Sequence, residues 1–81
     1  MTEPIEATTT LDVTGASCPI PVVKTKQTID DLAVGEILEV LATDAGSMSD
    51  IRGWAAGTDG VELLDQIEED DVYRHYVERT D

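Results

Sequence analysis

The stretch "TTLDVTGASCPIPVVKTKQTIDDLAVG" (residues 9–35) changes its hydrophobic pattern halfway along, and this change decides the fold. Its opening, TTLDVTG, has the β-branched content of a strand and closes at Gly15. From Pro19 onward the apolar residues fall at helical spacing, and proline is well tolerated in the first turn of a helix. Glycine is common just after a helix, so Gly35 predicts where this helix ends.

The next two segments predict a second strand and a second helix. "EILEVLAT" (36–43) is a short, bounded apolar run, which indicates a strand buried on both faces. "DAGSMSDIRGWAAGTDG" (44–60) offers candidate helix caps followed by apolar residues at helical spacing. The candidate caps are Asp44, Ser47 and Ser49, and the residues expected to face inward are Met48, Ile51, Trp54 and Ala55.

The last third of the chain predicts a β-hairpin. "VELLDQIEE" (61–69) and "VYRHYVERT" (72–80) have strand patterns and flank the acidic turn EEDD (68–71). The expected order is therefore βαβαββ, an α/β (α+β) two-layer sandwich with a four-stranded mixed sheet and two helices on one face. Eighty-one residues fit one domain, which we predict over residues 10–81 after a flexible tail at residues 1–9.

The charge of the chain is strongly acidic. It has 18 acidic and five basic residues, a formal net charge of −13 at pH 7. Such a surface repels phosphate backbones and anionic membranes, so we expect no direct nucleic-acid binding and no membrane association. The excess of acidic residues could bind a basic partner protein, or it could be an adaptation to high intracellular salt. Because the acids are scattered along the whole chain, we favour salt adaptation in a halophile, where about 1 M salt shortens the Debye length to ~3 Å.

The cysteine count and the N-terminus indicate the compartment. One cysteine, Cys18, cannot form a disulfide within the chain, which fits a reducing environment. The sequence shows neither a signal-peptide pattern nor an apolar run long enough to span a bilayer. We therefore expect a cytoplasmic protein.

Cys18 lies at the start of the predicted helix, where unpaired N–H groups and the helix dipole favour an anion. Such a setting can lower a thiol pKa from ~8.5 into a range of about 3.5–7.5. Pro19 and Pro21 stiffen the loop, and Lys24 and Lys26, the only lysines, follow within eight residues. Two residues apart, the lysines cannot share one helix face. The alternative is that Cys18 is a small buried apolar side chain.

The motif Cys-Pro-x-Pro (residues 18–21) has several accompanying residues in register. It is preceded by Asp12 and Gly15, and it is followed by Gly35, Glu36, Asp44, Asp50, Ile51, Glu62 and Leu63. Through these residues the chain, from Leu11 to nearly its end, resembles the TusA/SirA family of small sulfur-carrier proteins, which have the same βαβαββ order.

The resemblance implies a sulfur relay. Cys18 would accept a sulfane sulfur as a persulfide from a cysteine desulfurase or a rhodanese-like donor, and would pass it to a cysteine of an acceptor protein. The destinations of the family include tRNA thiolation, molybdenum-cofactor assembly and dissimilatory sulfur metabolism. The chain would act as a carrier, not as a stand-alone turnover enzyme, and we expect no cofactor, no metal and a monomeric state.

The resemblance also assigns roles around the cysteine. Gly15, Pro19, Pro21 and Asp12 are expected to position the loop. Lys24, Lys26, Asp44 and Asp50 are candidate contacts for the thiolate or for a partner protein.

The chain departs from the family pattern at three points. Ala55 occupies a position where some relatives carry another cysteine, which excludes a two-cysteine redox cycle within one chain. Ala45 stands where proline is common, and basic residues are scarcer than in many relatives.

Two other functions remain open. The chain could be a non-catalytic regulatory or binding module with a structural thiol, or a redox sensor in which Cys18 forms a sulfenic acid or an intermolecular disulfide. His75 is the only histidine and is expected to be packed or on the surface, since one histidine and one cysteine cannot build a tetrahedral zinc site. The acidic turn at 68–71 could bind a cation, although a solvated turn is the simpler interpretation.

Overall fold

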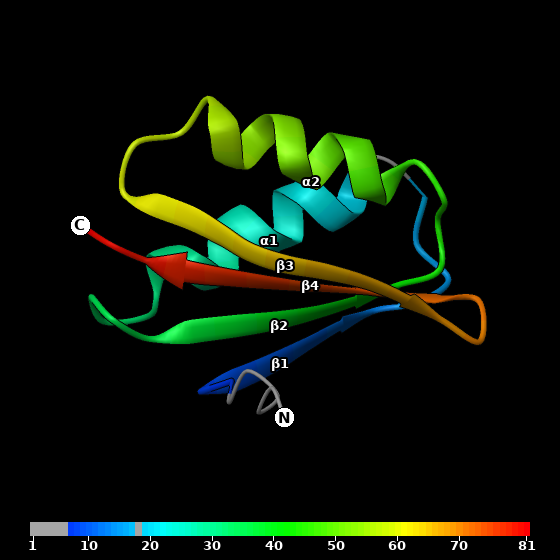
Figure 1. Ribbon diagram of the computed structural model, residues 1–81, viewed down its shortest axis with the longest axis horizontal. Helices are drawn as coiled ribbons and strands as arrows, with labels where there is room; N and C mark the ends of the chain where they lie inside the picture. The colour runs from blue at the N-terminus through cyan, green and yellow to red at the C-terminus, as the bar shows by residue number, and fades with distance from the viewer. Residues whose placement is uncertain (1–6, 18) are drawn as a thin grey trace.

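The computed structural model describes residues 7–17 and 19–81, which form one two-layer domain. The elements are β1 (Thr9–Val13), α1 (Ile20–Asp30), β2 (Ile37–Ala42), α2 (Ser47–Ala56), β3 (Val61–Glu69) and β4 (Val72–Arg79). The strands form one mixed sheet in the order β1-β2-β4-β3. The neighbours β1 and β2 pair in parallel, and the other two neighbouring pairs are antiparallel. Both helices lie on the same side of the sheet (Figure 1). The predicted βαβαββ sandwich is confirmed.

The strand register places three connections at one end of the sheet. Val13, the last residue of β1, pairs with Ala42, the last residue of β2, and Ala42 pairs with Tyr73 near the start of β4. Residues 14–17 and 19, residues 43–46, and the hairpin turn at 70–71 therefore lie at one edge, which we call the loop edge. The C-terminal ends of both helices lie at the opposite edge (Figure 1).

The core lies between the sheet and the helices. It is formed by Val13, Ile29, Leu38, Val40, Ala42, Ile51 and Val77. In β2 the buried residues Leu38, Val40 and Ala42 alternate with half-buried ones. The expectation that this strand is buried on both faces is therefore wrong, because the helices cover only one face of the sheet.

α1 ends five residues before Gly35, which corrects the predicted boundary. The helix stops at Asp30, and the Leu32 N–H already turns back to the Ile29 carbonyl at 3.1 Å. Arg79 of β4 caps this end, since its Nη1 donates to the carbonyls of Asp30 (2.8 Å) and Leu32 (2.5 Å). A side chain from the last strand thus satisfies carbonyls that a longer helix would have used.

α2 begins without a side-chain cap, contrary to the sequence prediction. Its N-cap residue is Gly46, and Ser47 is fully buried at the first helical position. Asp44 instead accepts a 2.9 Å bond from the Gly46 N–H, outside the helix. The predicted inward face is confirmed for Ile51 and Ala55, which are buried, whereas Met48 and Trp54 are half-buried.

The closing hairpin is confirmed and has a tighter turn than the acidic stretch suggested. Glu69 pairs with Val72, so the turn contains only Asp70 and Asp71, both with positive φ (52° and 66°). Aspartate tolerates this left-handed region better than most residues, and a two-residue turn of this hand suits a twisted hairpin.

Strand pairing at the N-terminal side starts at Thr8. The Thr8 N–H donates to the Ile37 carbonyl at 2.7 Å, and the Thr8 hydroxyl accepts from the Ile37 N–H at 3.2 Å. Residues 1–6 of the expected tail lie outside the described residues. Neither α1 nor α2 has the length and apolar character that a bilayer crossing requires, and no other helix occurs in the described chain.

Candidate functional site

The loop after β1 is organised by Asp12. Its Oδ1 accepts hydrogen bonds from the Thr14 hydroxyl (2.7 Å) and the Thr14 N–H (2.9 Å). These two bonds hold the pKa of Asp12 below its ordinary value, because both stabilise the ionised carboxylate. Asp12 therefore shapes the turn that leads to Gly15.

Gly15 connects this loop to the loop after β2. Its N–H donates a 2.8 Å hydrogen bond to the Thr43 hydroxyl. Its φ is +83°, a left-handed conformation that costs other residues energy, and a Cβ would meet nothing within 4 Å. Backbone conformation, and not lack of space, is therefore what requires glycine here.

The loop then enters α1 through a proline pair. Pro19 is the N-cap residue, the Ile20 N–H donates to the Ser17 carbonyl (2.9 Å), and the Val23 N–H donates to the Pro19 carbonyl (3.0 Å). Pro21 is buried in the first turn. Cys18, which stands between Ser17 and Pro19 in the sequence, lies outside the described residues.

The beginning of α1 is suited to an anion. Its first turn contains no acidic residue, and no described side chain caps it. The dipole of an eleven-residue helix places partial positive charge at this end. The N–H groups expected to be free are largely absent or paired, because Pro19 and Pro21 have none and those of Ile20 and Val23 donate to backbone carbonyls. The described residues before and after Cys18 in the sequence are thus hydrogen-bonded to the first turn of α1, and this end of the helix favours negative charge.

The two predicted aspartates after β2 lie in the neighbouring segment. Asp44 is in the β2–α2 loop, where its Oδ1 binds the Gly46 N–H. Asp50 is exposed in the first turn of α2. The structure therefore brings Asp12, Gly15 and Asp44 to the loop edge.

The two lysines have different surroundings. Lys26 forms an exposed ion pair with Asp30, one turn further along α1 (3.5 Å). Lys24 is exposed and forms no ion pair with another described residue. Lys24 is accordingly the lysine available to a partner, while Lys26 belongs to the opposite half of the helix.

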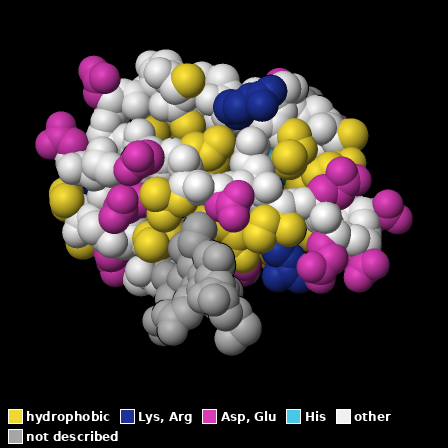
Figure 2. Space-filling model, viewed as in Figure 1, with side chains coloured by type: hydrophobic (Ala, Val, Ile, Leu, Met, Phe, Trp, Pro, Cys, Tyr) yellow, Lys and Arg dark blue, Asp and Glu magenta, His cyan; other side chains and the backbone are white. Residues whose placement is uncertain are grey.

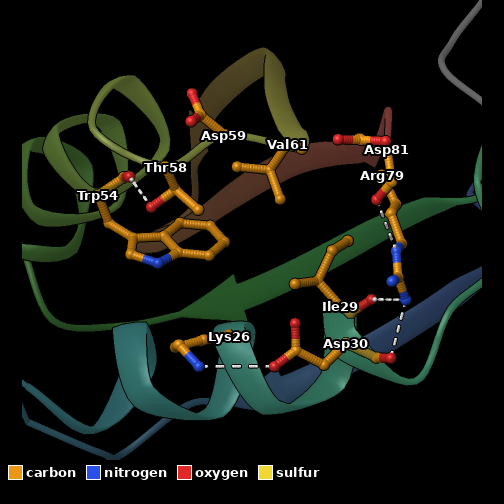
Figure 3. A pocket seen from close by; sticks show the side chains of 10 residues that line it. Lys26, Ile29, Asp30, Trp54, Thr58, Asp59, Val61, Arg79 and Asp81 are labelled. Atoms are coloured by element: carbon orange, nitrogen blue, oxygen red, sulfur yellow. Dashed lines mark hydrogen bonds and ion pairs between the residues drawn. The ribbon is translucent and has the colours of Figure 1, made fainter.

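A cavity of about 210 Å³ lies near the edge opposite the loops. Figure 3 shows its lining: Lys26, Ile29, Asp30, Trp54, Thr58, Asp59, Gly60, Val61, Arg79 and Asp81. Its cations are engaged, Lys26 by Asp30 and Arg79 by the end of α1. The described lining residues include neither cysteine nor histidine, so this cavity is separate from the loop edge in both place and chemistry.

A buried polar network, which no sequence pattern predicts, joins the start of α2 to β3 and β4. His75 is fully buried, with Nε2 at 3.1 Å from Ser47 Oγ and Nδ1 at 3.0 Å from Gln66 Nε2. Gln66 Nε2 also donates to the Met48 carbonyl (2.8 Å). Burial lowers the pKa of His75 to about 4, so the ring is neutral at neutral pH. Of the two expected positions for His75, packed or on the surface, the structure shows the packed one.

Sequence reasoning also missed Thr14 and Thr43. Each directly follows a strand of the parallel pair, and each hydroxyl binds a group of the loop edge. Their position at the carboxyl ends of neighbouring parallel strands was the available signal. No comparable pattern connects Ser47 with His75, which meet only after the hairpin has folded onto α2.

A family described as sulfurtransferase TusA matches residues 9–79. A candidate sulfur carrier protein of Halobacterium salinarum is 72% identical over 80 residues, covering 99% of both chains. The sulfur carrier protein TusA of Allochromatium vinosum is 34% identical over 70 residues, covering 86% of this chain and 91% of the relative.

A solved structure supports the same grouping. The crystal structure of a SirA-like protein from Desulfitobacterium hafniense superposes with a TM-score of 0.71 at 25% identity. The match covers 90% of this chain and 99% of that one.

Proposed function

Because the chain belongs to the TusA family of sulfur carriers, we propose that Cys18 accepts a sulfur atom as a persulfide and relays it to an acceptor protein. The observation that carries this proposal is the loop edge. There, the Gly15–Thr43 hydrogen bond fixes the segment that precedes the only cysteine in the sequence, and Pro19 begins α1 directly after it.

The proposed transfer needs no cofactor. The Cys18 thiolate attacks the outer sulfur of a persulfide on the donor, and its electron pair forms the new S–S bond. The S–S bond of the donor breaks, and its electron pair leaves on the donor thiolate. The sulfane sulfur changes partner without net oxidation or reduction. Onward transfer repeats the step, with the acceptor's thiolate as nucleophile and Cys18 as leaving group.

The positive end of α1 supports the proposed thiolate. Helix N-termini lower thiol pKa values because the positive end of the helix dipole stabilises the negative charge. The same thiolate is the attacking group in loading and the leaving group in delivery, so stabilising it assists both steps of a carrier.

The exposed face of α1 supports docking of a partner next to Cys18. Ile20 and Val23 are 45% and 42% exposed, and Lys24 follows Val23 on the same side of the helix. We call these three residues the α1 stripe. It fits a partner surface that combines an apolar patch with a carboxylate opposite Lys24, either on a cysteine desulfurase or rhodanese-like donor or on the acceptor protein.

The acidic surface supports a salt-rich cytoplasm as the setting. Figure 2 shows acidic side chains over much of the visible face and few basic ones. The 72% identical relative comes from Halobacterium, whose name denotes a salt-dwelling organism. A single thiol that must stay reduced to work also fits a cytoplasmic location.

The proposal is tested by intact mass after incubation with a persulfide donor in molar salt. Wild type is expected to gain one sulfur atom that a reducing thiol removes, and Cys18→Ser is expected to gain none. Because the chain has no other cysteine, Cys18→Ser is a complete control. Delivery is then followed by mixing the loaded protein with a thiol-bearing acceptor.

The two alternatives predict different results in the same assay. A structural thiol gains no sulfur and also resists a small alkylating agent. A redox sensor is oxidised by peroxide yet gains no sulfur from the donor. Either result would reject the carrier function.

A further inference from the structure

The donor and acceptor of each hydrogen bond in the network of His75, Ser47 and Gln66 can be assigned. A carbonyl oxygen only accepts hydrogen bonds, so the nitrogen of the Gln66 amide must face Met48. The same amide group donates its second proton to His75 Nδ1. Nδ1 is therefore an acceptor, and the neutral ring carries its proton on Nε2, from which it donates to Ser47 Oγ.

This bond anchors the beginning of α2. Ser47 is the first residue of the helix, and its fully buried hydroxyl is held by β4, while Gln66 of β3 holds the next carbonyl. Apolar contacts alone would allow α2 to shift along the sheet. A satisfied polar network permits one arrangement, since any shift leaves buried polar groups without partners.

The anchored helix start continues into the loop edge. Residues 43–46 connect β2 to Ser47, and the first of them, Thr43, accepts the hydrogen bond from Gly15. We propose that His75 is a positioning residue for the sulfur-accepting loop, because it fixes Ser47 and thereby the segment whose Thr43 binds Gly15, three positions before Cys18 in the sequence. This inference rests on the proposed function of Cys18.

The effect is expected on the reactivity of the thiol. Stabilisation of a thiolate by a helix start depends on how near the loop holds the sulfur to the positive end of the helix dipole. A loop that is less firmly held averages over poorer orientations. The thiolate is then less favoured, and the apparent pKa of Cys18 rises.

Three variants test the proposal. His75→Phe keeps an aromatic ring but removes both hydrogen bonds, and His75→Gln keeps a donor near the position of Nε2. Thr43→Val removes the hydroxyl that accepts the hydrogen bond from the Gly15 N–H, at an exposed site. The measurement is the rate of Cys18 alkylation by iodoacetamide as a function of pH in molar salt, together with the thermal midpoint of each variant.

His75→Phe and Thr43→Val are each expected to slow alkylation below the thiol pKa by about three- to tenfold, which corresponds to an upward pKa shift of about 0.5–1. His75→Gln is expected to restore most of the rate. The double variant His75→Phe/Thr43→Val is expected to be no slower than the slower single variant, because both changes break one chain of contacts.

An unchanged alkylation profile in a folded His75→Phe protein overturns the proposal, even if its thermal midpoint falls, and additive effects of the two changes overturn the link through Thr43. If His75→Phe does not fold, Ser47→Ala takes its place, since it removes only the acceptor. Persulfide loading is measured separately. Shifted alkylation profiles in a protein that takes up no sulfur would support the positioning role and reject the carrier function.

Discussion

The backbone N–H of Gly15 donates a 2.8 Å hydrogen bond to the hydroxyl of Thr43, 28 positions later in the chain. The bond joins the loops that leave two neighbouring parallel strands, whose last residues, Val13 and Ala42, are paired. The loop that precedes Cys18 is thus held by the following βα connection as well as by its own residues.

Thr43→Val is expected to lower the free energy of unfolding by about 0.5–1.5 kcal/mol, the usual net value of one hydrogen bond. The exchange of the Gly15 amide hydrogen should accelerate, which hydrogen exchange measured by NMR would detect. Thr58→Val is the matched control, because it removes a bond to the Trp54 carbonyl near the opposite edge. Unchanged exchange at Gly15 in Thr43→Val would contradict the assigned bond.

Gly15→Ala is expected to destabilise the fold by about 1–2 kcal/mol, the cost of placing a Cβ in the left-handed region. Gly53→Ala is its counterpart in α2, where a Cβ also has open space but the backbone is helical. That change should stabilise by about 0.5–1 kcal/mol. Urea unfolding of both variants measures the contrast, and two effects of the same sign would show that conformation does not decide the role of Gly15.

The elements of this fold follow from local patterns in the sequence. The short apolar run of β2, the helical spacing after Pro19 and the acidic turn before Val72 each depend on neighbouring residues, and each predicted element is found. The motif around Cys18 likewise pointed to the loop edge through adjacent residues.

The features that the sequence did not predict depend on residues far apart in the chain. α1 ends at Asp30, whose carbonyl accepts a hydrogen bond from Arg79, 49 residues later. Ser47 meets His75 across 28 residues, and only after the hairpin packs on α2. Such pairs are fixed by tertiary packing, which has no local signature.

His75 predicts a specific loss of stability in acid. Its pKa is lowered by burial from 6.5 to about 4, so between these pH values the unfolded chain binds a proton that the folded chain does not. The contribution of the neutral His75 side chain to the free energy of unfolding is complete above pH 6.5. It is lost as the pH falls toward 4. Urea midpoints of wild type and His75→Gln in molar salt should therefore converge from pH 7.5 to 4.5. A constant difference would contradict a neutral, buried imidazole.

Salt should stabilise the fold. With a net charge of −13 and only two ion pairs among the described residues, Lys26–Asp30 and Arg74–Glu39, repulsion outweighs attraction at low ionic strength. The thermal midpoint is expected to rise from low salt to molar KCl. Asp70→Asn/Asp71→Asn removes two charges while keeping residues that tolerate positive φ, so its midpoint should depend less on salt. A midpoint independent of salt in wild type would contradict this account of the acidic surface.

Lys24 and Lys26 provide a matched pair for testing where a partner docks. Lys24 belongs to the exposed α1 stripe, whereas Lys26 is paired with Asp30. Lys24→Gln is expected to slow sulfur transfer from a protein donor a few-fold, with a larger effect at lower salt, because charges at the rim of an interface act mainly on the association rate. Lys26→Gln should leave the rate unchanged. Loading from a small persulfide should be equal in both variants, which stopped-flow mixing followed by mass analysis would measure.

Equal slowing by both lysine variants would place docking elsewhere, and slower small-molecule loading in Lys24→Gln would show that this lysine acts on the thiolate and not on the partner.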